Sequence, residues 1–362
     1  MPVGRNYTPP LEALNNASSG ADRELERIRA FERTIGRFVG THETEIQLDF
    51  NDWVPTNSAI DRVMTYEYPT PPTLRYDPAF SEIDGSPLEG FSPRSARGGK
   101  NSRHGVFFGD LHFRNGLDLP VAVKPYEEED PKKTAWSTLK DYYNGLAVGH
   151  IGLYSLQPVG HLLDGSKTGY SITLLEETLT TLDSIDWSNY YPNIGAHPGM
   201  SNIWSQIGRQ AAMLHSLGAN THWDMAGRNM AETAEDYAFF IDWESSVISP
   251  VQPPQAEMRF EFSFPDLKEL MRTMCFSPYA QPEAGLGIFH GKNGDLWQAF
   301  RDVVFDEYLG VREDMATAAG DKAQRTEVMS ELDVLQGSLR NYMREKLEPM
   351  LQLPKTDVVN QA

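Results

Sequence analysis

Apolar side chains recur every three or four positions in several stretches of the chain, and this spacing predicts amphipathic helices. The expected helices cover residues 21–39, 131–150, the segment from Ile203 to a stop at Gly218, 267–274, 296–308 and 321–351. The first helix is expected to pack on the body of the protein, with docking of a protein partner as the alternative. The expected apolar side of the second helix is formed by Trp136, Leu139, Tyr143 and Leu146.

Short apolar runs predict strands between these helices. The segments Gly105–Phe113 and Leu119–Lys124 flank Asn115-Gly116, a dipeptide typical of a tight hairpin turn. Two further strand candidates are Gly169–Leu175 and Tyr237–Ile241. The second of these is apolar and aromatic throughout, which indicates a buried strand. Asp242 follows Ile241 directly, so its carboxylate is expected at the end of this strand.

Composition and charge narrow the class of protein. With 362 residues, 40% of them hydrophobic, the chain is long enough for two modest globular domains. The formal charge of −19, from 32 basic and 51 acidic residues, disfavours nucleic acid and anionic membranes as partners. No apolar run reaches the roughly 18 residues of a membrane span, and the single cysteine, Cys275, allows no intrachain disulfide. We expect a cytoplasmic protein without a membrane segment.

A basic loop stands out against this acidic background. Arg94, Arg97, Lys100 and Arg103 fall within ten positions, and Gly98 and Gly99 lie among them. Backbone N–H groups of a glycine-containing loop, together with basic side chains, can surround phosphate oxygens. The loop therefore predicts an anion nearby, and a solvated hairpin is the alternative.

Three oxygen-bearing side chains form a spaced set in the second half of the chain. Asp224 follows a predicted helix, Asn229 comes five residues later, and Asp242 ends a predicted strand. A carboxylate, an amide and a second carboxylate around one volume suit phosphoryl transfer from a magnesium nucleotide, because Mg²⁺ prefers hard oxygen ligands. Asp and Asn also gather in loops for ordinary turn reasons, which is the alternative for either residue alone.

This set resembles the catalytic and metal-binding loops of the protein-kinase-like fold. His-Trp-Asp at 222–224, Asn229 at its distance from Asp224, and Ile-Asp-Trp-Glu at 241–244 carry the resemblance, closest in style to aminoglycoside and choline phosphotransferases. It implies that Asp224 orients the acceptor hydroxyl and takes its proton, while Asn229 and Asp242 bind Mg²⁺. Glu244 is either a supporting contact or a solvated turn residue.

Leu-Pro-Val-Ala-Val-Lys at 119–124 is similar to the kinase strand whose lysine contacts the nucleotide's phosphates, which makes Lys124 that lysine. Asp141 on the following helix would stand in for the glutamate that pairs with it, and a solvated Asp141 is the alternative. Gly98, Gly99 and Lys100 would cover the phosphates, although the family's Gly-x-Gly-x-x-Gly is missing. The stretch around Glu177 resembles the hinge that binds adenine.

The resemblance implies an α+β, two-lobed protein-kinase-like fold with an antiparallel-sheet N-lobe and a mainly helical C-lobe. The expected domains are an N-terminal extension at 1–58, a nucleotide-binding N-lobe at 59–177, a catalytic and acceptor-binding C-lobe at 178–353 and a tail at 354–362. The expected activity transfers the γ-phosphoryl group of Mg-ATP to a hydroxyl of a small molecule. Its acceptor could be cationic, such as an amino sugar or choline, in keeping with the acidic chain. An atypical protein kinase or effector, and an inactive pseudokinase scaffold, stay open as alternatives.

Overall fold

The computed structural model describes residues 28–33, 88–94, 105–150, 153, 155–163, 168–175, 179–182, 198–217, 220–233, 237–248, 256–276, 296–320 and 322–351. These residues fall into two compact units, each with its own core. The first unit takes its residues from Met1–Asp49, Pro78–Leu139 and Pro158–Leu175, and the second takes nearly all its described residues from Lys140–Gln157 and Glu176–Ala362. Both units combine helices with an antiparallel sheet, in agreement with the expected α+β class.

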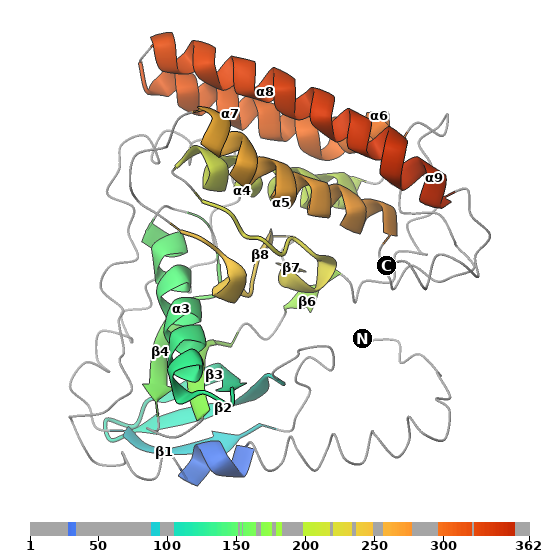
Figure 1. The fold of residues 1–362 in the computed structure, drawn as a ribbon. Coiled ribbons are helices and arrows are strands. Elements are labelled where there is room, and N and C mark those ends of the chain that lie inside the picture. Colours follow the sequence, from blue (N-terminus) through green and yellow to red (C-terminus); the bar gives the residue numbers. More distant parts are fainter. Residues whose placement is uncertain are drawn as a thin grey trace. The chain divides into compact units, whose positions relative to one another are not determined.

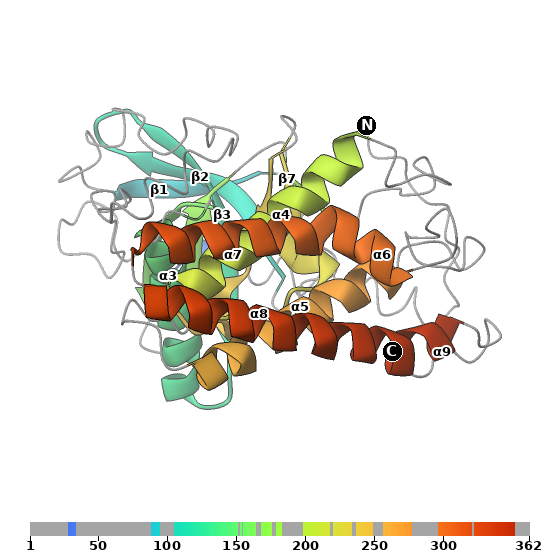
Figure 2. The same cartoon turned by 90° about the horizontal axis from the view of Figure 1, so that it is seen from above.

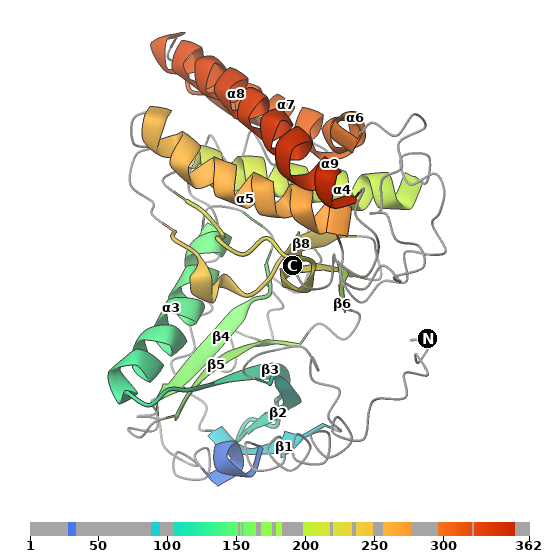
Figure 3. The same cartoon turned by 45° about the vertical axis from the view of Figure 1, so that its right-hand side comes forward.

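A five-stranded antiparallel sheet forms most of the described part of the first unit (Figure 1). Its strands are β1 (Leu88–Pro93), β2 (Phe107–Phe113), β3 (Asp118–Glu127), β4 (Pro158–Leu163) and β5 (Thr168–Leu174). Their order across the sheet is β1-β2-β3-β5-β4, and Figure 3 shows β3, β5 and β4 running beside one another. Sequence neighbours β3 and β4 are therefore separated by β5.

The predicted hairpin between β2 and β3 is confirmed. Gly116 has a φ of 86°, a left-handed conformation that glycine adopts without steric cost, and its N–H donates to the Phe113 carbonyl at 2.9 Å. The Asn115 side chain accepts a hydrogen bond from the Leu117 N–H at 3.1 Å. This turn fixes the register that places Phe107 opposite Val123.

The inner face of the sheet carries the apolar core of the first unit. Phe107, Val121, Val123 and other alternate residues are fully buried. Residues 28–33 are helical, and Phe31 in this segment places its ring against Phe91, Phe107 and Tyr170 with centroids 4.8, 5.4 and 4.8 Å away. The expectation that the N-terminal helix packs on the protein is confirmed for these described residues.

Helix α3 (Pro131–His150) has the predicted bounds, but two of the four residues predicted on its apolar side are exposed. Trp136 and Tyr143 are 68% and 48% exposed. The side chains that the helix buries come instead from Thr134, Thr138, Tyr142 and Val148. Two threonines can be buried because their hydroxyls are satisfied locally: the Thr138 hydroxyl donates to the Thr134 carbonyl at 2.8 Å, and the Thr134 hydroxyl accepts from the Glu128 N–H at 3.1 Å.

Helices dominate the second unit. They are α4 (Pro198–Ser216), α5 (Ala256–Phe276), α6 (Leu296–Phe300), α7 (Asp306–Ala318), α8 (Lys322–Tyr342) and α9 (Glu348–Leu351), with π-helical turns at Arg301–Phe305 and Met343–Leu347. Helix α4 packs against α7, and α8 packs against both α5 and α7 (Figure 2). All the helices predicted after residue 200 are confirmed, and their inner sides form one apolar core.

A small antiparallel sheet completes the second unit. Its strands are β6 (Thr180–Thr181), β7 (Met230–Glu232) and β8 (Ala238–Phe240), in that order. Every residue of β8 is buried, which confirms the buried strand predicted before Asp242. Short 3₁₀ turns at Gly227–Asn229 and Trp243–Ser245 flank the β7–β8 hairpin.

Some expectations fall outside the described residues. These are the positions predicted in the basic loop, Gly98, Gly99 and Lys100, and the hinge position Glu177. Among the helices of the described residues, none combines the length and the apolar character needed to span a bilayer.

Candidate active site

The predicted polar set lies on two loops that both contain a strained backbone. Trp223 and Asp242 have φ values of 62° and 65°, and they are the only non-glycine residues with positive φ in the described part of the chain. A left-handed conformation costs a bulky residue about 1–3 kcal/mol and persists where the surroundings hold it in place. One of these positions directly precedes Asp224, and the other is Asp242 itself.

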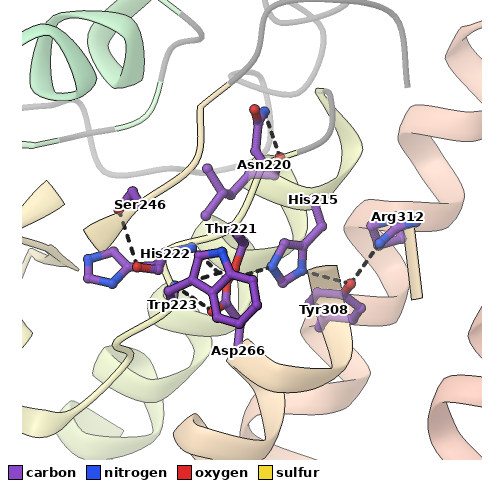
Figure 4. Close-up of polar contacts among 10 residues, drawn as sticks. His215, Asn220, Thr221, His222, Trp223, Ser246, Asp266, Tyr308 and Arg312 are labelled. Atoms are coloured by element: carbon purple, nitrogen blue, oxygen red, sulfur yellow. Dashed lines mark hydrogen bonds and ion pairs between the residues drawn. The ribbon is translucent and has the colours of Figure 1, made fainter. Parts of the chain in front are cut away.

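Asp266, on helix α5, holds the first loop. Its two carboxylate oxygens accept the backbone N–H groups of His222 and Trp223 at 2.7 and 2.8 Å, and its side chain is 1% exposed (Figure 4). Hydrogen bonds to a buried carboxylate are charge-assisted and stronger than neutral ones. Asp266 therefore fixes the backbone just before Asp224. Asp266 is not among the residues predicted from the sequence, and its place beside the apolar positions of a helix is the one signal that pointed to it.

A chain of buried polar contacts continues from Asp266 into the helical core (Figure 4). His215 Nε2 lies 3.0 Å from Asp266 Oδ2, and its Nδ1 lies 3.0 Å from the Tyr308 hydroxyl. Arg312 donates to that hydroxyl at 2.7 Å and to both carboxylate oxygens of Glu331 at 3.0 Å. Burial raises the pKa of Tyr308 to about 12, so the hydroxyl stays protonated at neutral pH. The loop is thereby tied to helices α4, α7 and α8.

Asp224 is positioned by two neighbours on its own loop. Asn229 donates from Nδ2 to Asp224 Oδ2 at 2.8 Å and to the Asp224 carbonyl at 3.1 Å. Arg228 donates from one nitrogen, Nη2, to both carboxylate oxygens at 2.8 and 2.7 Å. Asn229 is 4% exposed, whereas the Asp224 side chain is 31% exposed. The carboxylate is thus oriented from a buried side and reachable from solvent.

Backbone pairing brings Asp242 to the same loop. The Ile241 N–H donates to the Asn229 carbonyl at 2.8 Å, which places the residue before Asp242 opposite Asn229. The Ile241 carbonyl in turn lies 3.0 Å from His222 Nε2. Asp224 and Asn229 are therefore in direct contact, Asp242 follows the residue that pairs with Asn229, and the carboxylates of Asp224 and Asp242 both act electrostatically on His222.

His222 is the buried centre of this arrangement. Its ring packs at a tilt against the rings of Phe240 and Trp243, with centroids 5.3 and 4.7 Å away. Burial lowers the pKa of His222, although the nearby carboxylates of Asp266, Asp242 and Asp224 act in the opposite direction. A neutral imidazole that donates from Nε2 to a carbonyl fits this environment. His222 therefore serves as a rigid spacer between the two loops.

The turn after Asp242 is also anchored. Asn144 of helix α3 donates to the carbonyls of Trp243 and Ser246 at 2.9 and 3.0 Å. The Trp243 indole N–H donates to the Ser155 hydroxyl at 2.8 Å. These contacts hold the turn that follows Asp242. Glu244 in this turn is half-buried.

The side chains of Asn229 and Asp242 suit a hard divalent cation. Because the Asn229 nitrogen faces Asp224, the amide oxygen is turned to the other side of the group, where it can act as a ligand. Mg²⁺ is usually held by one or two protein oxygens, with water and substrate phosphates completing the shell. No cluster of three or more His, Cys, Asp or Glu side chains suited to a metal occurs in the part of the chain that the structure describes. Asn229 and Asp242 could therefore supply two oxygen ligands, with water and a bound substrate completing the shell.

Lys124 lies on β3 in the first unit, opposite Ser171 of β5. Its ammonium group sits 5.0 Å from the centroid of the Tyr126 ring. Since Phe107 pairs with Val123, Lys124 lies at the end of the sheet where the chain enters β2 after the basic loop. Asp141 belongs to the second unit, and its pairing with Lys124 stays a prediction.

Comparison with known proteins does not identify a family for this chain. A scan against protein-family models and a search of curated proteins give no match. The functional argument therefore depends on the site itself.

Proposed function

We propose that the protein is a phosphotransferase with a two-lobed kinase-like fold that moves the γ-phosphoryl group of Mg-ATP to a hydroxyl of a small molecule. The observation that carries the proposal is the gathering of Asp224, Asn229 and Asp242 around His222, on loops held by buried contacts. Positioning and electrostatic stabilisation supply most of the catalysis in phosphoryl transfer. A rigid set of oxygen ligands beside an accessible carboxylate meets that requirement.

In the proposed reaction, Asp224 accepts a hydrogen bond from the acceptor hydroxyl. The hydroxyl oxygen forms a bond to the γ-phosphorus while the bond from that phosphorus to the β,γ-bridging oxygen breaks, and ADP leaves with the electron pair. Asp224 takes the hydroxyl proton. Asn229 and Asp242 would hold Mg²⁺, which neutralises phosphate charge when bound.

The arrangement of the first unit supports a nucleotide-binding role for Lys124. The basic loop connects β1 to β2, and the register places Lys124 beside the point where this loop rejoins the sheet. Lys124 is proposed to contact the α- and β-phosphates, and Gly98, Gly99 and Lys100 are proposed to cover them. Asp141 and Glu177 keep their proposed roles toward Lys124 and adenine.

A pseudokinase scaffold is the second candidate, and one contact favours it: Arg228 occupies both oxygens of the proposed base. An atypical protein kinase would use the same chemistry with a protein hydroxyl as acceptor. Enzyme and scaffold differ in turnover, not in nucleotide binding.

The experiment that separates them compares Asp224→Asn with the wild type. We expect Mg-ATP binding within about twofold of wild type, because Asp224 is proposed to contact the acceptor and not the nucleotide, and because asparagine keeps an oxygen that can accept from Asn229. ATP turnover should fall about 100-fold or more, in line with typical general-base contributions. Binding by calorimetry and ADP formation are the two measurements. Wild type that binds Mg-ATP without any turnover would leave the scaffold as the better description, whereas equal turnover in both proteins would contradict the proposed role of Asp224.

A further inference from the structure

The contact between Arg228 and Asp224 bears on the class of acceptor. A carboxylate offers about four acceptor positions on its two oxygens. Arg228 takes one on each oxygen, at 2.8 and 2.7 Å, and Asn229 takes another on Oδ2. Most of the positions that an acceptor hydroxyl could use are therefore occupied by neighbouring side chains.

The two neighbours differ in how firmly they are held. Both residues belong to one 3₁₀ turn, but Asn229 is buried, whereas the Arg228 side chain is 53% exposed. An ion pair at this exposure contributes about 0–1 kcal/mol, so Arg228 can leave Asp224 at little cost. Asn229 would then keep the carboxylate in its orientation. Arg228 is the neighbour that a ligand can displace.

An anionic group is the partner that would draw Arg228 away. A guanidinium binds phosphate or carboxylate through two parallel hydrogen bonds, whereas here a single nitrogen serves both Asp224 oxygens. A cationic acceptor would instead compete with Arg228 for Asp224 and be repelled by it. The chain as a whole has a formal charge of −19 and repels anions, but the Arg228 guanidinium offers an anion a favourable contact at this one place.

We infer that the acceptor carries a phosphate or carboxylate group near its reactive hydroxyl, and that Arg228 binds this group and thereby frees Asp224. The inference depends on the proposed phosphotransferase function and names the substrate class of the same site. It replaces the cationic acceptor that whole-chain charge suggested. The exposed ring of Trp223, 51% accessible and next in sequence to Asp224, lies on the same loop.

The first test uses water as the acceptor, so it needs no knowledge of the natural substrate. ADP formation from Mg-ATP is measured with and without methyl phosphate or acetate, which carry the two anion chemistries without a second functional group. We expect at least one anion to raise the basal hydrolysis of the wild type about threefold or more. Arg228→Gln should hydrolyse Mg-ATP at the raised rate without any anion, and adding either anion should not change that rate. The anion with the larger effect identifies phosphate or carboxylate as the group recognised.

Arg301→Gln is the matched control, because Arg301 forms an exposed ion pair with Asp306 at 3.0 Å elsewhere in the same unit. It should keep both the basal rate and the response to anions. Hydrolysis that no anion changes, or an equal response in Arg228→Gln, would overturn the inference and leave the proposed function intact. Wild type that neither binds nor hydrolyses Mg-ATP would overturn the proposed function, and the inference with it.

A second test compares four acceptors that share one diol: glycerol, glycerol 3-phosphate, glycerate and 3-amino-1,2-propanediol. Phosphorylated product is expected with kcat/KM at least tenfold higher for an anionic diol than for the neutral and cationic ones. Arg228→Gln should reduce this ratio toward one by raising the KM for the anionic diol, with the KM for ATP unchanged. A preference for the amine would contradict the inference directly.

Discussion

Replacement of Asp266 by Asn tests whether the buried carboxylate sets the loop that carries Asp224. The asparagine is nearly isosteric, but its side chain offers only one oxygen. One of the two backbone N–H groups that Asp266 accepts, from His222 or Trp223, would face an NH₂ group and lose its partner. A buried unsatisfied donor costs about 1–3 kcal/mol, and loss of the charge beside His215 adds to this. We expect the free energy of unfolding to fall by about 2–4 kcal/mol.

Urea unfolding gives that free energy, and the matched control is Asp306→Asn, which removes the charge of an exposed aspartate. The control should change stability by less than about 0.5 kcal/mol. In folded Asp266→Asn, the backbone at Trp223 can relax from its φ of 62°, so turnover should fall more than Mg-ATP binding does. Stability within 0.5 kcal/mol of wild type, together with unchanged turnover, would refute the anchoring role.

Three further predictions concern the second unit. Arg312→Met should lower stability by about 3–5 kcal/mol, because it leaves Glu331 as a buried unpaired charge, and the double variant with Glu331→Leu should regain most of it in urea unfolding. Burial lowers the pKa of His222, so as the pH falls the unfolded chain binds a proton at this side chain before the folded protein does. The free energy of unfolding should therefore be steady above about pH 6.5 and decrease as the pH falls below it. His222→Gln should weaken that dependence. Gly208→Ala should lower stability by about 1–3 kcal/mol, because the added Cβ would lie 2.5 Å from a backbone carbonyl oxygen of the neighbouring π-helical turn. Gly337→Ala, whose added Cβ has nothing within 4 Å, should instead stabilise helix α8 by about 0.5–1 kcal/mol. An equal effect of the two substitutions would contradict the packing described.

Local patterns predicted the elements that depend on local interactions. The Asn115-Gly116 turn and its two strands follow from backbone conformations that few other residues adopt, and helix α4 and strand β8 follow from apolar spacing. The spaced set of Asp224, Asn229 and Asp242 was visible because the hairpin between them is short. In the structure Asn229 bonds to Asp224, and its carbonyl pairs with the residue before Asp242.

Contacts between distant parts of the chain were not predictable in this way. Asp266 reaches backbone groups 43 and 44 residues earlier, and nothing in either segment indicates its partner. The predicted apolar side of α3 was wrong at Trp136, which is exposed, because the helix buries threonines whose hydroxyls find local hydrogen-bond partners. Arg228 was passed over because a charge four residues from an aspartate is ordinary on a protein surface. Its importance depends on which aspartate it contacts.

Calorimetric titration of ATP, with magnesium and with a chelator, into the wild type and Asp242→Asn tests the central claim most directly. Asp242 is proposed as a metal ligand, so it acts before any chemistry. The account predicts binding to the wild type that depends on magnesium, and at least a tenfold weaker affinity in Asp242→Asn with the fold intact by circular dichroism. No binding of ATP by the folded wild type at millimolar concentration, or equal magnesium-dependent affinity in both proteins, would contradict it.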